Sequence, residues 1–235
     1  MPRIALDAMG GDHAPAATIA GALLALGELT DGACIQLVGR ADDIRTELAR
    51  QGGVPKGLES RIEIVHASEV VEMIDRPSVA VRGKRDSSMV VGLRMQADGK
   101  SDAFVSAGNT GAQMAASTVI LRLHEGLTRP AISTLIPTDR DVPLVMLDSG
   151  ANVDCSPQEL LQFARLGAVY AEDILGRSNP TIGLLSVGEE PEKGSLPVKA
   201  AHALLAQSGL NFIGNVEGRD LPHGSSARGP RCDLQ

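Results

Sequence analysis

A glycine-containing loop between an apolar run and a helix-like run is the feature of this sequence best suited to chemistry. Ala103–Val105 is followed by the loop Ser106–Gly111, read Ser-Ala-Gly-Asn-Thr-Gly, and then by an Ala/Met/Ala pattern. This order predicts a strand, a loop and a helix, and the first N–H groups of such a helix are unpaired and attract anions. Ser106, Asn109 and Thr110 add side-chain donors suited to a phosphate or to a developing oxyanion. The alternative is that Asn109 and Thr110 only cap the helix.

A dense basic cluster precedes this loop. It places Arg76, Arg82, Lys84 and Arg85 within ten residues of a chain whose formal net charge is −7. Such a run is either a solvated helix face or a clamp for phosphate that faces the glycine loop.

The composition limits the classes of function. The 235 residues are 43% hydrophobic, which can supply a packed core, and only 2% aromatic. An acidic chain with few aromatic side chains argues against nucleic acid as a partner. Cys34, Cys155 and Cys232 are widely separated and show no CxxC spacing, so neither a disulfide framework nor a zinc site is indicated. No group of residues at ligand spacing calls for a metal, and we expect no cofactor.

No signal for export or membrane insertion is present. Met1–Asp12 lacks the basic and apolar regions of a signal peptide, and the chain has no uninterrupted apolar run of about 18 residues. We therefore expect a cytoplasmic protein that contacts a membrane only peripherally.

Short apolar strands alternate with helices along the chain. The predicted strands are 3–6, 35–39, 62–65, 103–105, 132–136, 144–147, 181–186 and 211–217, and the predicted helices include 15–27, one from 42 to the glycines at 52–53, 160–175 and 198–207. The stretch 73–99 is predicted to be helical but polar, with an N-cap at 86–88 that begins a second helix. This alternation predicts an α/β fold, a three-layer sandwich with a largely parallel sheet, in which ligands bind outside the carboxyl ends of the strands.

Polar loops follow most of these strands and form a candidate site. Their polar residues are Asp7, Asp12 and His13; Asp148, Asn152 and Asp154; Glu189, Glu190 and Lys193; and Asn215 and Glu217. The chain lacks a GxSxG elbow, an HExxH pair, a GxxxxGK[ST] loop and a GxGxxG loop after the first strand, which weakens hydrolase, zinc protease, kinase and ordinary dehydrogenase interpretations. A site rich in donors to anions suits direct transfer, in which a held phosphate attacks a carbonyl.

Six dispersed segments carry a resemblance to a known family. They are Ala5–Pro15, the run from Arg82 and Lys84 to Asp86–Met89, Asp102–Ala112, Gly150–Cys155, Val187–Gly194 and Asn211–Asp220. In sequence and order they closely resemble the bacterial fatty acyl-ACP:phosphate acyltransferases of phospholipid synthesis.

The resemblance implies a reaction and partners. An acyl group passes from acyl carrier protein to inorganic phosphate and gives an acyl phosphate for lipid metabolism. It also implies a homodimer, a loose peripheral association with the cytoplasmic face of the cell membrane, and a fold like that of the isopropylmalate dehydrogenases and phosphotransacetylases.

The same resemblance suggests roles for individual residues. His13, Lys84 and Asn109 are the candidate catalytic residues, with His13 either a general acid for the departing thiolate or a structural cap. The candidate phosphate- or substrate-binding residues are Arg82, Ser106, Thr110, Gly111, Asp148, Asn152, Asp154, Glu189, Lys193 and Asn215.

The resemblance is expected to end at Asp220. We expect residues 1–220 to form a single, C-terminally incomplete α/β domain, and 221–235 to be an aberrant, disordered tail, because that stretch has no periodicity.

Three alternatives remain open. A short-chain phosphotransacetylase or phosphotransbutyrylase would use coenzyme A. A non-catalytic remnant would bind acyl carrier protein without turnover. A metal-dependent dehydrogenase of the related fold rests only on the aspartates of the loops.

Overall fold

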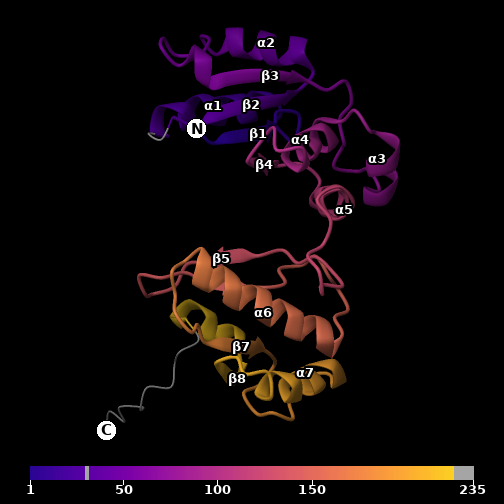
Figure 1. Ribbon diagram of the computed structural model, residues 1–235, viewed down its shortest axis with the longest axis vertical. Coiled ribbons are helices and arrows are strands. Elements are labelled where there is room, and N and C mark those ends of the chain that lie inside the picture. The colour runs from indigo at the N-terminus through magenta and orange to yellow at the C-terminus, as the bar shows by residue number, and fades with distance from the viewer. Residues whose placement is uncertain (30–31, 225–235) are drawn as a thin grey trace. The chain divides into compact units, whose positions relative to one another are not determined.

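A computed structural model describes residues 1–29 and 32–224 (Figure 1). The chain divides into two compact units, Met1–Leu123 and His124–Gln235. The sequence predicts one domain over residues 1–220, and the two units divide this range. The boundary of that domain at residue 220 stays a prediction. Most of the predicted disordered tail, residues 225–235, lies outside the described residues.

Unit 1 is built on a four-stranded parallel sheet. Its strands are β1 (Arg3–Asp7), β2 (Cys34–Gly39), β3 (Ile62–His66) and β4 (Ala103–Val105), in the spatial order β3-β2-β1-β4. Its helices are α1 (Ala16–Glu28), α2 (Ala41–Arg50), α3 (Pro77–Gly83), α4 (Ser88–Ala97) and α5 (Thr110–Ile120), with a 3-10 turn η1 (Glu59–Arg61). Because β1 pairs in parallel with both β2 and β4, the carboxyl ends of these strands share one edge.

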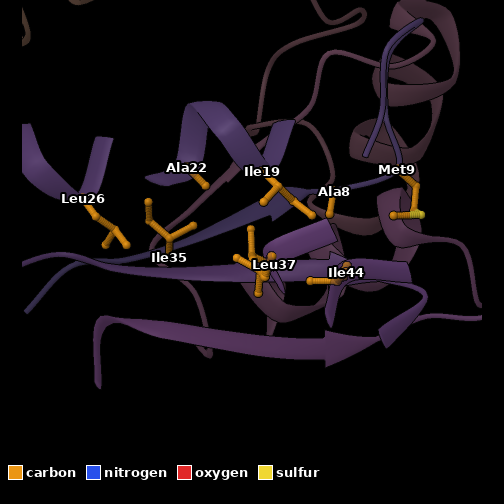
Figure 2. Packing of buried hydrophobic residues seen from close by; sticks show 9 residues of the cluster. Ala8, Met9, Ile19, Ala22, Leu26, Ile35, Leu37 and Ile44 are labelled. Carbon is orange, nitrogen blue, oxygen red and sulfur yellow. The ribbon is translucent and has the colours of Figure 1, made fainter. Parts of the chain in front are cut away.

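Alternation along β2 supplies the two apolar faces of this sheet. Ile35 and Leu37 point toward α1 and α2, where they pack with Ile19 and Leu26 (Figure 2). Val38 faces the opposite side and packs in a cluster with Met95 of α4. Successive strand residues point to opposite faces, so helices cover both sides and unit 1 has three layers, as the sequence predicts.

A glycine lets α4 approach the sheet closely. Gly92 lies in the middle of α4, and a Cβ on this residue would sit 2.4 Å from Cε2 of Phe104. The Phe104 ring therefore occupies the space that the Cβ atom of any other residue at position 92 would need.

The described residues of unit 2 form two small sheets and two main helices. Its elements are β5 (Thr134–Ile136), β6 (Leu144–Met146), α6 (Pro157–Asp173), β7 (Ile182–Leu185), α7 (Leu196–Ala206), β8 (Phe212–Val216) and the 3-10 helix η2 (Gly218–His223). β7 and β8 are parallel, and Leu184, Leu205 and Ala201 form the centre of the core beneath them.

The start of α6 agrees with its sequence signature. Ser156 is the N-cap, its Oγ accepts the Glu159 backbone N–H, and the Glu159 carboxylate accepts the Ser156 backbone N–H. Pro157 occupies the first turn, where its missing N–H costs no hydrogen bond. This reciprocal pair confirms the predicted capping box.

The other strand pairs among the described residues are parallel, and the antiparallel pair of β5 and β6 is an exception within the predicted, largely parallel fold. The polar stretch 73–99 contains two short helices, and the Ser87 side chain caps the second of them, α4, as predicted. Two predictions need correction. Pro15 is the N-cap of α1 and not its first residue. Leu221–His223 are predicted to belong to a disordered tail but form the last residues of the 3-10 helix η2. The His223 side chain lies 2.7 Å from the Asp139 carboxylate.

Overpacking at position 92 should destabilise unit 1. We expect Gly92→Ala to lower the free energy of unfolding by about 1–3 kcal/mol, because the new methyl group collides with a ring held in the core. Gly21→Ala is the matched control, since a Cβ there meets nothing within 4 Å and removes a helix-interior glycine. The control should gain about 0.5–1 kcal/mol. Urea unfolding followed by circular dichroism gives both values, and equal effects of the two variants would contradict this account of the packing.

The acid stability of α2 should depend on Glu47. Hydrogen bonds from Arg50 and then Gln51 lower the pKa of Glu47 from 4.5 to about 2. The charged form is favoured in the folded state, so its stabilisation is complete above about pH 4.5 and is lost as the pH falls toward 2. We expect Glu47→Gln to reduce the loss of stability between pH 5 and pH 2 in urea unfolding. Glu28→Gln controls for the loss of one carboxylate, and an equally steep loss in Glu47→Gln and wild type would refute the prediction.

Candidate functional site

Asp7 and Ser106 join the ends of two adjacent parallel strands. Asp7 closes β1, is buried, and accepts a 2.8 Å hydrogen bond from the Ser106 hydroxyl after β4. The Met9 backbone N–H donates to the other carboxylate oxygen at 3.1 Å, and the Ser106 oxygen accepts the N–H of Gly108 at 3.0 Å. The Ser106 hydroxyl is therefore engaged in holding the loop, and any phosphate contact must share it.

Glycines bring the loops after β1 and β4 into direct contact. A Cβ on Gly10 would lie 2.6 Å from Asp7 Oδ2 and 2.8 Å from Ser106 Oγ. Gly11 has φ of +106° and faces Ala107, with 3.3 Å between a Cβ built there and the Ala107 carbonyl oxygen. Only residues without a side chain allow this approach, which explains the paired glycines after β1.

The Asn109 side chain makes hydrogen bonds to the first turn of α5 and to the 72–75 segment. Its Oδ1 accepts the Ala112 N–H at 3.0 Å and caps α5. Its Nδ2 lies 3.3, 3.1 and 3.1 Å from the carbonyl oxygens of Glu72, Met73 and Asp75. The capping alternative is thus realised for Asn109, and its amide donors are already engaged with the 72–75 segment.

The first turn of α5 offers backbone donors. Among the described residues, no acceptor is recorded for the N–H groups of Thr110 and Gly111, and the Thr110 side chain is exposed. Gly111 lies against α3, because a Cβ there would come 2.8 Å from Pro77 Cγ. Unpaired N–H groups at the positive end of an 11-residue helix form a place where an anion is stabilised.

Lys84 forms an ion pair with a residue that sequence reasoning did not single out. Its Nζ donates to Asp75 Oδ2 at 2.5 Å and to the Val70 carbonyl at 2.8 Å. The Lys84 hydrogen bond is the main cause that lowers the pKa of Asp75, with a second contribution from the Glu72 N–H. Asp75 lies on the segment that Asn109 holds, so lysine and loop belong to one contiguous cluster. An acid nine residues before a lysine carries no recognisable spacing signal.

The remaining predicted residues of unit 1 lie on the surface. The side chains of Asp12, His13 and Arg82 are exposed, and no hydrogen bond or ion pair is recorded for them within the described ranges. The backbone carbonyl of His13 accepts the Ala17 N–H at the start of α1.

In unit 2, Asp148 and Asn152 organise the turn after β6. Asp148 accepts the Ile132 N–H at 2.7 Å and the Asn152 N–H at 2.7 Å through its two oxygens. The Asn152 side chain donates to the Pro130 carbonyl at 2.9 Å. The Asp154 side chain is exposed beside this turn.

The loops after β7 and β8 meet, as parallel strands require. Asn215 is buried and donates to the Glu190 carbonyl at 2.8 Å, while its Oδ1 has no partner in the described part of the chain. Glu189 lies 3.5 Å from the guanidinium of Arg219, and Lys193 is exposed.

An apolar cavity of about 490 Å³ lies within unit 2. β6, α6 and β7 contribute much of its wall, and its polar members are Arg140, Asp148, Asn152, Cys155, Arg177, Ser178 and Thr181. Burial raises the pKa of the Cys155 thiol, and Arg177 Nε is buried without a recorded partner. Arg177 follows α6 in a turn, where an isolated arginine gives no sequence signal. Within residues 1–29 and 32–224, no group of three His, Cys, Asp or Glu side chains could hold a metal ion, and no helix is long and apolar enough to cross a bilayer.

The fold has a counterpart among solved structures. The EutD phosphotransacetylase from Staphylococcus aureus superposes with a TM-score of 0.61 at 18% sequence identity, covering 92% of this chain and 68% of that one. At this identity the match supports the α/β fold class, which agrees with the predicted phosphotransacetylase-like fold.

Sequence relatives are much closer. The phosphate acyltransferase of Desulfitobacterium hafniense strain DSM 10664 / DCB-2 is 50% identical over 98% of this chain and 67% of its own length. The phosphate acyltransferase of Desulforamulus reducens is 51% identical over 96% of this chain and 66% of its own length. The chain thus spans about two thirds of the length of these curated relatives.

A family model described as "Fatty acid synthesis protein" matches residues 2–227. This match continues beyond Asp220, where the resemblance was predicted to end. The chain therefore belongs to the fatty acid synthesis protein family and is similar throughout to phosphate acyltransferases.

Proposed function

We propose that this protein transfers a fatty acyl group from the thioester of acyl carrier protein to inorganic phosphate. A phosphate oxygen attacks the thioester carbonyl, a C–O bond forms, the C–S bond breaks, and the carrier thiolate departs and takes up a proton. The products are an acyl phosphate and the free carrier, as in the family's role in phospholipid synthesis.

The unpaired N–H groups at the start of α5 are the observation that carries this proposal. The same loop carries the Ser106 hydroxyl, which is fixed by Asp7, and Thr110 adds an exposed side chain with a hydroxyl group. A tetrahedral phosphate needs several donors that converge from one side, and a loop before a helix presents them without reorganisation. We assign phosphate binding to Ser106, Thr110 and Gly111.

Lys84 supplies the positive charge in this assignment. It reaches phosphate by exchanging Asp75 for the incoming anion, since both are anionic oxygen acceptors for the same ammonium group. Arg82 is an auxiliary contact from the exposed end of α3. Asn109 acts as a positioning residue, because its amide already ties the 72–75 segment to the loop.

The other assignments remain proposals that rest on the family resemblance. His13 is exposed beside the start of α1 and could return a proton to the thiolate. Asp148 and Asn152 line the cavity and orient the substrate, with Asp154, Glu189, Lys193 and Asn215 on neighbouring loops. A homodimer, a cytoplasmic location and a peripheral contact with the membrane are likewise proposed.

The cavity in unit 2 favours a long acyl group over an acetyl group. Its walls are mainly apolar and its volume of about 490 Å³ far exceeds the needs of two carbons. This favours the fatty acyl reaction over short-chain transfer from coenzyme A.

Two variants at one ion pair test the phosphate site. We expect Lys84→Ala to raise the KM for phosphate by about tenfold or more, because a hydrogen bond to a charged group is worth about 1.5–3 kcal/mol. Asp75→Asn should lower the KM for phosphate, because a neutral amide binds the Lys84 ammonium group more weakly than a carboxylate does and phosphate can then displace it more easily. Formation of labelled acyl phosphate from palmitoyl-ACP and labelled phosphate gives both values. Urea unfolding checks that each variant folds. If both variants raise the KM equally, the ion pair is only structural.

Narrowing the cavity tests the acyl site. Gly167 lines the cavity, and a Cβ there would lie 3.3 Å from Leu147 Cδ1. We expect Gly167→Leu to lower kcat/KM about tenfold for palmitoyl-ACP and less than twofold for hexanoyl-ACP, because the added side chain shortens the apolar space. Val169→Leu on the exposed side of α6 is the control. An unchanged ratio between the two chain lengths in a folded Gly167→Leu protein would remove the cavity from the mechanism.

A further inference from the structure

A surface around α3 combines exposed apolar side chains with unpaired arginines. We call it the α3 patch, and its members are Met73, Ile74, Arg76, Val79, Arg82 and Arg85. Ile74 is 93% exposed and Val79 is 64% exposed. Large aliphatic side chains at this exposure next to cations are typical of a surface that meets a partner.

The members of the patch lie on α3 and directly before and after it. Val79 and Arg82 are three residues apart on α3, a spacing that makes them neighbours on the helix surface, and Arg76 is the N-cap residue that precedes the helix. Ala80 is buried in the core. Arg85 folds back onto the C-terminal end of α3, where its Nε donates to the Arg82 carbonyl at 3.3 Å.

The positive charge of the patch is not neutralised by its neighbours. In the described part of the chain, no carboxylate pairs with Arg76, Arg82 or Arg85. The nearby acid Asp75 is occupied by Lys84, and exposed Glu72 is a single charge against three guanidinium groups. The protein as a whole carries a net charge of −7, so an acidic partner is repelled by most of the surface and attracted here.

The patch is attached directly to the candidate phosphate loop. Asn109 holds the carbonyls of the segment that carries Met73, and Pro77 at the start of α3 contacts Gly111. A partner that docks on α3 is therefore delivered beside the first turn of α5.

We propose that the α3 patch is the docking surface for an acidic protein, the carrier that delivers the acyl thioester. This inference rests on the proposed function. Guanidinium groups steer and orient the carboxylates of the carrier, and Met73, Ile74 and Val79 supply the apolar centre of the contact. An anionic membrane is less well matched, because lipid-binding clusters usually contain about 4–8 basic residues, and α3, at seven residues, is short for an interfacial helix.

The test compares one acyl group on two carriers. We expect the double variant Arg76→Glu/Arg85→Glu to raise the KM for palmitoyl-ACP by about tenfold and to leave turnover of palmitoyl-CoA within about twofold. Ile74→Ser should weaken use of palmitoyl-ACP without a change of charge. The control Arg45→Glu/Lys56→Glu makes the same charge change on α2 and the loop after it, and should behave as wild type. Arg82 is left unchanged because it belongs to the proposed phosphate site.

A binding measurement separates this inference from the proposed reaction. Fluorescence anisotropy of labelled palmitoyl-ACP should show about tenfold weaker binding to Arg76→Glu/Arg85→Glu, and wild-type binding should weaken as salt rises. If wild type forms no acyl phosphate from either thioester but this binding pattern holds, the proposed reaction fails and the docking surface stands. Unchanged affinity in the folded double variant, or equal losses with both thioesters, overturns the docking surface. Loss of binding only to phosphatidylglycerol vesicles would assign the patch to the membrane and refute the proposal.

Discussion

The amide of Asn109 connects the parts of unit 1 on which the candidate site depends. One side chain caps α5 and holds the carbonyls of the 72–75 segment, so the helix start and the approach to α3 have a common support. The same contacts occupy the amide donors of Asn109, so these donors are not available to an anion. In the proposed site, anion binding therefore depends on backbone N–H groups. Those of Thr110 and Gly111 remain available, because the cap pairs only with the Ala112 N–H.

Local signals in the sequence predicted most of the elements. The strand, loop and helix over 103–120 and the capping box at Ser156 depend on contacts between residues close in the chain, and the structure confirms them. The alternation of strands and helices predicted the fold class, and the family resemblance added its likeness to the phosphotransacetylases. The sequence does not decide the role of Asn109, because a helix cap and an anion donor require the same residue at the same place.

Contacts between distant residues could not be predicted in this way. Nothing in the composition of β5 and β6 distinguishes an antiparallel pair from two strands of a parallel sheet, since orientation depends on the path of the chain between them. The basic run at 82–85 likewise does not reveal which cation is paired. The Asp75 partner of Lys84 is set by the loop that Asn109 holds, and that loop is a tertiary feature.

The Lys84–Asp75 pair explains how the partly buried ammonium group of Lys84 is stabilised when no ligand is bound. A lysine withdrawn from water is costly unless an anion accompanies it, and Asp75 serves as that anion when phosphate is absent. In the proposed reaction the entering phosphate replaces a single negative charge. A dianion gains more from the ammonium group than the carboxylate it displaces, while a neutral or weakly charged molecule gains less. In the proposed reaction, the internal ion pair would therefore make binding depend on the charge of the ligand as well as on its shape, on a loop already fixed by Asn109.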